Sequence, residues 1–485
     1  MRTILTSFLL GISALAAQVE AQELRGVWIA NTGSTVLESR AEIAQTMEVL
    51  RAYGINTVYP VMWSKGLTCY PSAVAKEVVG SAIDPRYGDR DPLEQVIYEA
   101  HRRGIEVVAW LEYGFAAEHA KKPTTLLKRN PKWAAVGPDG KRVEKNDFTW
   151  ANAFDPEVQS FVTDMVVELA RTYDIDGLQG DDRLPALPST GGYDAATLKA
   201  WAQHSGSTKK PEPKDEAWVA WRADRLSDWL AQLQTTVRRF GGLQLSSSPS
   251  CYPWGLNEYL QDAQAWAERG LVDALHPQVY RYDLPAYVRT LREQTGALQR
   301  RDGPLLAPGV LVKSGSYVIS SEYLLGAVQA NRDAGCAGEV HFFLEGLRER
   351  DDALLKALHA GPYRTEALAP WRVAKPRPAP IETLVDAEGR AELTVQQTGQ
   401  WDLWIDLGEV GQAKTNAAQQ VEVSWTLAGV SGLQRVRVHE GLARVTRLQV
   451  PANAGVSVQV RAAAKASAST PGRAVLLATR EMLAK

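Results

Sequence analysis

Four acidic residues lie within nine positions of the segment "DIDGLQGDDR", which runs from Asp174 to Arg183. The apolar and glycine residues inside it predict a short buried strand that ends at the adjacent pair Asp181 and Asp182. Two neighbouring carboxyl groups suit acid–base chemistry, because one group can hold a proton while the other is ionised. Adjacent strand residues point in opposite directions, so only one of the pair should face a substrate.

A third carboxyl group, that of Glu112, directly follows the apolar run "VVAWL". Burying an unpaired carboxylate is costly, so we expect Glu112 to face an open site. Two carboxyl groups can hydrolyse a glycosidic bond: one protonates the leaving oxygen, and the other attacks the anomeric carbon or activates water. The candidate catalytic residues are therefore Glu112, Asp181 and Asp182.

The elements that must position these groups alternate between strand-like and helix-like segments from Glu23 to about Ala360. A helical segment follows each predicted strand. The predicted strands are residues 25–30, 57–63, 106–114, 176–182, 243–250, 272–280, 305–311 and 338–346. This alternation predicts an α/β fold, a (β/α)8 TIM barrel. An open doubly wound sheet is the alternative, but no glycine-rich phosphate loop follows the first strand.

In such barrels the active site lies at the carboxyl ends of the strands. Polar and aromatic side chains that follow the predicted strands are therefore candidates for substrate binding: Asn31, Trp63, Tyr113, His276, Gln278, Tyr280 and Glu345. A metal site is the rival interpretation, in which His276 and His341 would meet Asp181. Neither HxH nor HExxH spacing occurs, so we expect no metal and no cofactor.

The N-terminal stretch "MRTILTSFLLGISALAAQVEA" predicts a signal peptide, with a charged start, a short apolar run and a small-residue cleavage site. No later stretch holds about 20 uninterrupted apolar residues, so we expect an exported protein, periplasmic or secreted, that does not span a membrane. The net charge of −2 gives no electrostatic reason to expect a nucleic-acid partner. With only Cys69, Cys251 and Cys336 there is no disulfide framework, although Cys69 and Cys251 could pair or stay free.

The chain changes character after the barrel. A proline-rich stretch predicts a linker, and the stretch after it alternates apolar and polar positions, which predicts a small all-β, sandwich-like domain. The expected domains are the signal peptide (1–21), the barrel (22–360), the linker (361–380) and the accessory domain (381–485). Three tryptophans of the accessory domain form either a sugar platform or part of its core: Trp401, Trp404 and Trp425.

Six stretches of the barrel segment carry a family resemblance: "RGVWIA", "LRAYGINTVYPVMW", "AHRRGIEVVAWLEYG", "YDIDGLQGDD", "WRADRLSDWL" and "VDALHPQVY". With these motifs, in this order, the chain resembles the glycosyl hydrolase-like 10 family of bacterial exported proteins. The resemblance implies a (β/α)8 glycoside hydrolase that acts on glycan strands. For some relatives it implies action on peptidoglycan stripped of its stem peptides.

Carried over by position, the family's paired acids correspond to Asp181 and Asp182, and its strand-three acid corresponds to Glu112. The resemblance also implies roles for a helix-borne arginine and for a proline-glutamine-tyrosine motif: Arg222, Pro277, Gln278 and Tyr280. Arg183 departs from the family, because many relatives have an aromatic residue after the paired acids. This departure bears on the sugar preference more than on the reaction.

We therefore expect an exported glycoside hydrolase whose partner is a polysaccharide or a peptidoglycan glycan. Glu112 would be the general acid/base. The hypothesis places Asp182 in contact with the sugar and Asp181 in support, with the reverse assignment left open. Arg222 and His276 would position the acids or bind hydroxyls. The alternatives are a non-catalytic glycan-binding barrel and a metal-dependent polysaccharide deacetylase.

Overall fold

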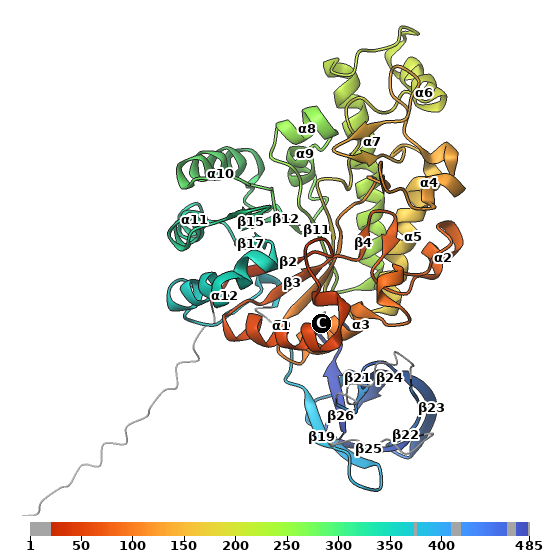
Figure 1. Ribbon diagram of the computed structural model, residues 1–485, viewed down its shortest axis with the longest axis vertical. Coiled ribbons are helices and arrows are strands. Elements are labelled where there is room, and N and C mark those ends of the chain that lie inside the picture. Colours follow the sequence, from red (N-terminus) through yellow and green to blue (C-terminus); the bar gives the residue numbers. More distant parts are fainter. Residues whose placement is uncertain (1–20, 373–375, 409–418, 463–471, 484–485) are drawn as a thin grey trace, which may run out of the picture.

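The computed structural model describes residues 21–372, 376–408, 419–462 and 472–483. It shows a barrel with a β module packed below it (Figure 1). The expected signal peptide, apart from Ala21, lies outside the described residues. Within the described part of the chain, no helix is both long and apolar enough to cross a bilayer.

One parallel sheet closes on itself to form the barrel. Its strand order is β13-β12-β11-β10-β6-β3-β2-β17-β14. The two ends of this order, β13 (Leu305–Leu306) and β14 (Gly309–Leu311), are consecutive in the chain, so they are two halves of one barrel strand. The remaining strands are β2 (Leu24–Ile29), β3 (Thr57–Pro60), β6 (Glu106–Leu111), β10 (Gly177–Gly180), β11 (Gln244–Ser247), β12 (Ala274–Leu275) and β17 (Gly338–Phe342). The predicted (β/α)8 barrel is confirmed.

Helices surround this sheet, as Figure 1 shows. The outer helices are α1 (Arg40–Ala52), α3 (Pro92–His101), α5 (Pro156–Thr172), α7 (Glu216–Val237), α9 (Ala263–Glu268), α10 (Leu284–Leu298), α11 (Ser321–Asp333) and α12 (Leu344–Ala360). Local signals set their starts: the Asp155 side chain accepts from the Glu157 amide, and Pro156 is the first residue of α5. The βα loops add α2 (Ala73–Val78), α4 (Leu126–Arg129), α6 (Ala195–Ser205) and α8 (Trp254–Tyr259).

The barrel interior is filled by large side chains rather than by solvent. Trp28 lies at its centre, with ring centroids 5.9 Å from Tyr59 and 6.1 Å from Trp110. The Trp28 indole donates to the Gln179 side chain at 2.6 Å. His276, predicted to act at the mouth, is fully buried against this group, with its ring centroid 6.5 Å from that of Trp28.

The C-terminal segment forms two antiparallel sheets of four strands each, with the orders β19-β26-β21-β24 and β20-β25-β22-β23. The strands are β19 (Ile381–Leu384), β20 (Arg390–Val395), β21 (Gly399–Asp406), β22 (Gln419–Leu427), β23 (Val430–Val438), β24 (Leu442–Val450), β25 (Ala454–Ala462) and β26 (Arg473–Ala478). Trp401 is buried between the sheets, and Trp425 packs against the same core. Trp404 is also buried, so the two buried tryptophans are packing residues and not a sugar platform.

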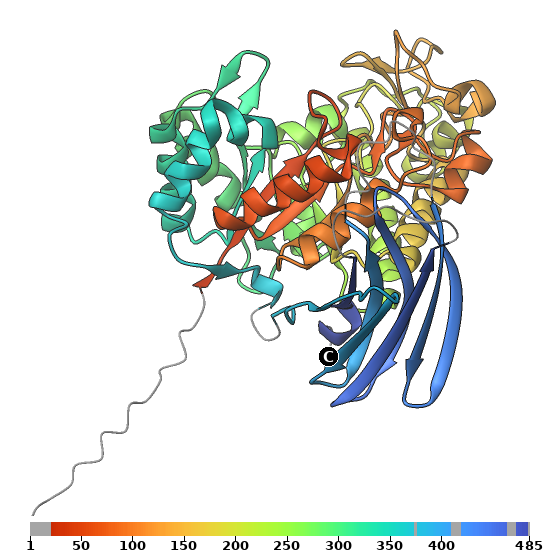
Figure 2. The ribbon, with the colours of Figure 1, turned by 60° about the horizontal axis from the view of Figure 1, so that its bottom comes forward.

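The β module is joined tightly to the barrel beside α1 and α3 (Figure 2). The Trp404 ring centroid lies 5.2 Å from that of Tyr98 on α3. The Asp406 carboxylate accepts from the Tyr98 hydroxyl at 3.0 Å and from the Arg40 guanidinium at 2.6 Å. These contacts join the outer face of one module sheet to the helices of the barrel.

The predicted linker packs under the barrel. Arg372 donates to Glu106 and to Asp176, each at 2.6 Å, and Arg377 also donates to Asp176. Asp176 further contacts the His101 ring at 2.8 Å. Burial alone would raise the pKa of Asp176, but Arg377 and His101 hold it well below the usual range. Because Glu106 and Asp176 lie at the starts of β6 and β10, the module is docked opposite the carboxyl mouth.

Candidate active site

The carboxyl ends of β6 and β10 bring two of the candidate acids side by side. The two strands are parallel neighbours, and Leu111 pairs with Gly180 at the last position of each. The next residues along the chain are Glu112 and Asp181. Because paired strands lie about 4.8 Å apart, these two residues begin their loops next to each other.

The alternation of side chains along the strands gives both acids the same direction. Trp110 and Gln179 are paired one step earlier, and both contact Trp28 inside the barrel. Side chains two positions apart on a strand share a face. Continued for one residue past each strand, this alternation gives Glu112 the direction of Trp110 and Asp181 that of Gln179, toward the barrel axis.

Asp181 is held in one orientation by residues of the next two strands. Its Oδ1 accepts from the Ser248 hydroxyl at 2.7 Å and from the Gln278 amide at 2.8 Å. Its main-chain carbonyl accepts from the Gln261 amide at 3.1 Å. The carboxyl group is buried, and burial, together with the neighbouring Asp182, raises its pKa well above the usual range.

Arg183 supplies positive charge to all three acids. Its Nη1 lies 3.1 Å from Asp182 Oδ1 and 3.4 Å from Asp181 Oδ2, and it donates to the Glu112 carbonyl at 3.2 Å. The Asp182 side chain is 23% exposed, so it is the most open of the aspartates at this site. Burial raises the pKa of Asp182, and Arg183 opposes that shift.

Glu112 is 7% exposed, and its Oε2 accepts no hydrogen bond from any described residue. Burial raises its pKa to about 7. The negative charge of Asp182 adds to this shift, whereas Arg183 and Lys65 oppose it. A carboxyl group with a pKa near neutrality can hold a proton and deliver it, which is the property required of a general acid.

Gly114 allows the loops after β6 and β10 to approach closely. Its φ is +44°, and a Cβ built there would lie 2.3 Å from the Arg183 carbonyl oxygen and 2.6 Å from the Leu184 Cβ. The same Arg183 carbonyl accepts from the Phe115 amide at 3.0 Å. The absence of a side chain therefore lets the loop that carries Glu112 pack on the loop that carries the aspartates.

Aromatic rings flank the acids on either side. The Tyr113 ring has the Arg183 guanidinium 4.8 Å and the Lys65 ammonium 5.5 Å from its centroid, and Phe148 lies 5.0 Å away. On the other side, Tyr280 stacks on Phe342 with centroids 5.2 Å apart. Burial raises the pKa of the Tyr280 hydroxyl, and the charge of Asp181 raises it further.

Three of the predicted binding residues lie away from the mouth. Trp63 is buried, donates to the Gly114 carbonyl at 2.9 Å and packs on a helix side chain. His276 contacts the Ala307 carbonyl at 2.9 Å in the barrel interior, and burial lowers its pKa to about 4. Arg222 is fully buried and donates only to backbone carbonyls, those of Trp218, Ser189, Gly191 and Pro213.

Asn31 and Glu345 lie on the far side of the mouth from Asp181. The Asn31 amide donates to Cys69 Sγ at 3.3 Å. Cys251 Sγ instead donates to the Gln278 carbonyl at 3.2 Å, and all three cysteines are free, so Cys69 and Cys251 do not pair. Glu345 is the second residue of α12, and burial raises its pKa.

No group of three or more histidine, cysteine, aspartate or glutamate side chains in the described ranges is arranged to hold a metal ion. His276 and His341 do not converge on Asp181, because His341 bonds the Tyr363 hydroxyl at 2.9 Å and His276 bonds a backbone carbonyl. The three-residue site of the rival interpretation is therefore not formed by these side chains.

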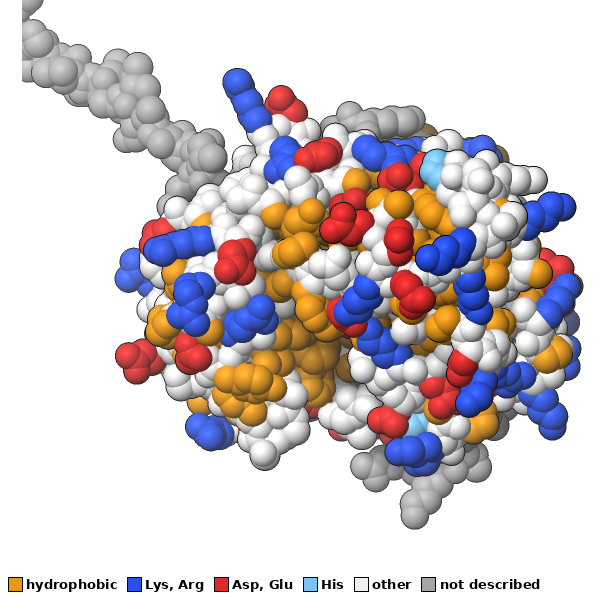
Figure 3. Space-filling model, turned by 90° about the horizontal axis from the view of Figure 1, so that it is seen from above, with side chains coloured by type: hydrophobic (Ala, Val, Ile, Leu, Met, Phe, Trp, Pro, Cys, Tyr) orange, Lys and Arg blue, Asp and Glu red, His pale blue; other side chains and the backbone are white. Residues whose placement is uncertain are grey.

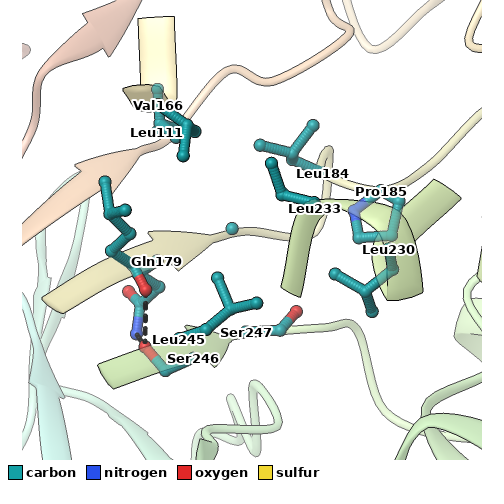
Figure 4. Close-up of a pocket in the computed structure, with 12 residues that line it drawn as sticks. Leu111, Val166, Gln179, Leu184, Pro185, Leu230, Leu233, Leu245, Ser246 and Ser247 are labelled. Atoms are coloured by element: carbon teal, nitrogen blue, oxygen red, sulfur yellow. Dashed lines mark hydrogen bonds between the residues drawn. The ribbon is translucent and has the colours of Figure 1, made fainter. Parts of the chain in front are cut away.

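A small cavity lies behind the acids, between the sheet and α5 and α7 (Figure 4). Leucine side chains dominate its lining, and the hydrogen bond between Gln179 and Ser246 closes one side. Its volume is about 10 Å³, enough for at most one water molecule. It is a packing defect of the wall and not a substrate site.

Sequence reasoning missed several residues that shape this site. Gln261 holds Asp181 through its main-chain carbonyl, although it is an ordinary polar residue in the sequence. Lys65 lies in the loop after β3 and reaches the Tyr113 ring. No sequence pattern indicates these two residues, because their contacts depend on how separate loops pack.

A closed barrel with carboxyl groups at the carboxyl ends of neighbouring strands is an architecture that glycoside hydrolases use. The family model described as glycosyl hydrolase-like 10 matches residues 23–301. The match covers more than half of the chain, so this protein belongs to the glycosyl hydrolase-like 10 family.

Two relatives with assigned names share the barrel segment. Glycosyl hydrolase DigH of Escherichia coli (strain K12) is 26% identical over 305 residues, which cover 54% of this chain and 66% of DigH. Glycosyl hydrolase YngK of Bacillus subtilis (strain 168) is 24% identical over 312 residues, which cover 57% of this chain and 58% of YngK. The chain thus spans less than two thirds of the length of each relative.

Solved structures of glycoside hydrolases share the fold. The glycoside hydrolase domain of PgaB (BpsB) from Bordetella bronchiseptica aligns with a TM-score of 0.53 at 13% identity, over 69% of this chain and 99% of that one. The catalytic domain of β-amylase from Paenibacillus polymyxa aligns with a TM-score of 0.51 at 10% identity, over 74% of this chain and 100% of that one. At these identities the likeness concerns the fold alone.

Proposed function

We propose that this protein is an exported glycoside hydrolase that cuts O-glycosidic bonds within a polysaccharide. The observation that carries the proposal is the strand register, in which Glu112 and Asp181 directly follow paired residues and point toward the same axis. Two carboxyl groups that converge on one mouth can flank a glycosidic bond. Membership of a glycosyl hydrolase-like family supports a glycan as the substrate.

Glu112 acts in this proposal as the general acid/base. Burial raises its pKa to about 7, so a large share of the group holds a proton at neutral pH. Its Oε2 is buried and has no hydrogen-bond partner among the described residues, so no protein group competes with the leaving oxygen of a sugar for its proton. Proton transfer to that oxygen lowers the barrier to breaking the bond.

Asp181 is the second carboxylate in this proposal. The sequence-based hypothesis put Asp182 in contact with the sugar, but the register favours Asp181, which shares the inward direction of Glu112. Ser248 and Gln278 fix the Asp181 carboxyl group. The charge of Arg183 and the Ser248 hydrogen bond oppose the rise of its pKa, and so favour the ionised form that attacks or orients water. Asp182 then pairs with Arg183, whose positive charge also lies beside Asp181.

Peptide-free peptidoglycan glycan strands are the first substrate to test. This choice rests on the resemblance to exported relatives and on the N-terminal stretch that has the pattern of a signal peptide. A protein delivered to the periplasm or the cell exterior would meet such strands there. Other exported polysaccharides belong in the same panel, because Arg183 departs from the family pattern beside the acids.

The test measures new reducing ends from purified peptide-free glycan strands, with the products sized by mass spectrometry. Glu112→Gln and Asp181→Asn should each lower turnover at least ~100-fold, the low end for losing a positioned acid or base. Glu48→Gln is the matched control, because Glu48 is an exposed acid on α1 and should leave turnover unchanged. Near-normal turnover in both active-site variants would refute the assignment.

Other outcomes identify the alternatives. If Asp182→Asn abolishes turnover and Asp181→Asn does not, the roles of the two aspartates are reversed. Binding of the strands without new reducing ends supports the non-catalytic glycan-binding barrel. Release of acetate that stops after addition of a chelator supports the metal-dependent deacetylase.

A further inference from the structure

Two large aromatic side chains of the barrel are unusually exposed. Trp254 is 54% exposed and Tyr282 is 65% exposed, and the other large exposed hydrophobic side chains in the described residues, Leu384, Val430 and Leu433, belong to the β module. Trp254 begins α8, which follows β11, and Tyr282 lies between β12 and α10. Both therefore lie on loops at the carboxyl ends of the strands, where barrel enzymes bind substrate.

Each of these rings contacts a neighbouring tyrosine ring. The Trp254 ring centroid lies 5.5 Å from that of Tyr259, whose hydroxyl accepts from Asn146 at 2.7 Å. The Tyr282 ring meets Tyr317 edge to face, with centroids 4.9 Å apart. Exposed tryptophan and tyrosine rings combine an apolar face with a polar group, and this combination suits a binding surface.

These rings continue the candidate site along the rim of the barrel. Gly180 pairs with Ser247 on β11, and Ser247 pairs with Leu275 on β12, so the loops with the two rings follow the Asp181 loop in order. Tyr282 comes two residues after Tyr280, which stacks on Phe342 beside the acids. The loops that carry the two exposed rings therefore lie next in order after the Asp181 loop around the rim of the barrel.

The end of the molecule that carries the barrel mouth has a surface suited to a glycan chain. Seen from the side away from the β module, acidic and basic side chains are interspersed, and hydrophobic side chains gather in a hollow between two lobes (Figure 3). The apolar faces of sugar rings can lie on aromatic rings while their hydroxyls remain in water.

We propose that Trp254 and the Tyr282–Tyr317 pair are outer sugar-binding platforms that hold rings of the same glycan chain beyond the bond that is cut. This inference rests on the proposed function and deepens it, because it makes the protein an enzyme of long chains rather than of free disaccharides. Platforms away from the acids contribute binding to long substrates and leave the chemistry of the bond unchanged.

The experiment compares Trp254→Ala and Tyr282→Ala with the full-length wild-type protein on two substrates. The substrates are peptide-free peptidoglycan strands and a tetrasaccharide prepared from them. On the long strands each variant should lose roughly tenfold in kcat/KM, the factor that about 1.4 kcal/mol of binding represents, mostly through a higher KM. On the tetrasaccharide kcat/KM should stay the same.

Leu384→Ala and Leu433→Ala provide the matched controls, because they remove exposed hydrophobic side chains of the β module. They should leave kcat/KM unchanged on both substrates. Unchanged values for the platform variants on long strands, or equal losses on both substrates, would overturn the inference.

If the wild-type protein releases no reducing ends, the proposed function fails but the platforms can still be tested. Retardation of the protein in a gel that contains the long strands measures binding alone. The platform variants should then migrate faster than the wild type, and equal retardation of all proteins would overturn the inference.

Discussion

Burial of the Glu112 carboxyl group costs folding free energy and also raises the pKa of that group. Its carboxyl group is almost fully buried, and one of its oxygens has no hydrogen-bond partner within the described residues. Such burial penalises the ionised form and raises the pKa of the carboxyl group to about 7. The penalty that destabilises the folded state at high pH also leaves a proton on Glu112 near neutral pH, which the proposed role of general acid requires.

The pH dependence of stability should report this penalty. The pKa of Glu112 is 4.5 in the unfolded chain and about 7 in the fold. Between these values the folded state binds more protons, so stability falls as pH rises through the window and is lowest above it. Glu112→Gln removes the penalty, so its stability relative to the wild type should be greater at pH ~8 than at pH ~4, by up to about 3 kcal/mol.

Thermal unfolding of both proteins at the two pH values measures this difference. Comparing two pH values cancels any effect of the glutamine that does not depend on pH. A difference between the proteins that stays constant from pH ~4 to pH ~8 would mean that Glu112 titrates at its ordinary pKa.

At the scale of elements, the site depends on two loops that touch. The loop after β6 carries Glu112, the loop after β10 carries the aspartates, and Gly114 is the point of closest approach. Trp63 supports this contact from behind, through its hydrogen bond to the Gly114 carbonyl. Arg222 fixes a more distant part of the second loop through three of its backbone carbonyls, those of Ser189, Gly191 and Pro213. These residues support the loops that carry the acids from within the protein.

Gly114→Ala tests the contact between the loops. The new Cβ would lie 2.3 Å from the Arg183 carbonyl oxygen, so the loops must separate. We expect a loss of about 1–3 kcal/mol in stability and a fall in turnover, because Glu112 is two residues away. Gly104→Ala is the control: Gly104 has a φ of +72° but no atom within 4 Å of a Cβ, so it isolates the cost of the backbone conformation.

Urea unfolding and the reducing-end assay measure the two effects. Gly104→Ala should lower stability by about 1 kcal/mol and leave turnover unchanged. If Gly114→Ala behaves in the same way as Gly104→Ala, close loop packing does not control the site.

At the scale of the whole molecule, the β module and its linker pack against the amino ends of the barrel strands. The linker residues Arg372 and Arg377 neutralise Asp176 and Glu106 under the strands that carry the acids. Arg480 of the module donates to backbone carbonyls of the segment that leads into β10. The module is therefore built into the underside of the barrel, and its buried Trp401 and Trp404 serve packing.

Arg372→Met should strongly destabilise the protein, because it leaves two buried carboxylates short of a partner. The expected loss is about 3–5 kcal/mol, the range for breaking a buried ion pair from one side. Arg51→Met is the matched control, since Arg51 pairs with Glu366 at the surface and should cost at most about 1 kcal/mol. Thermal unfolding compares the two variants. Equal stability would show that the linker contacts are dispensable.

The sequence by itself determined the helices and strands, and it determined that the candidate acids lie at the carboxyl ends of the strands. Apolar runs, a capping Asp155 followed by Pro156, and alternating positions after the linker act between near neighbours, so they could be identified without coordinates. The rule that barrel sites lie at strand ends then placed Glu112 and the aspartate pair at one mouth.

Only the tertiary structure decided which side chains meet. The register between β6 and β10 places Glu112 beside Asp181, because Leu111 pairs with Gly180 at the strand ends. His276 follows its strand as predicted, yet it fills the barrel interior, since the closed sheet leaves that position no access to solvent. Pairings between residues far apart in the chain depend on how the sheet closes and how its loops pack, and local sequence patterns do not contain that information.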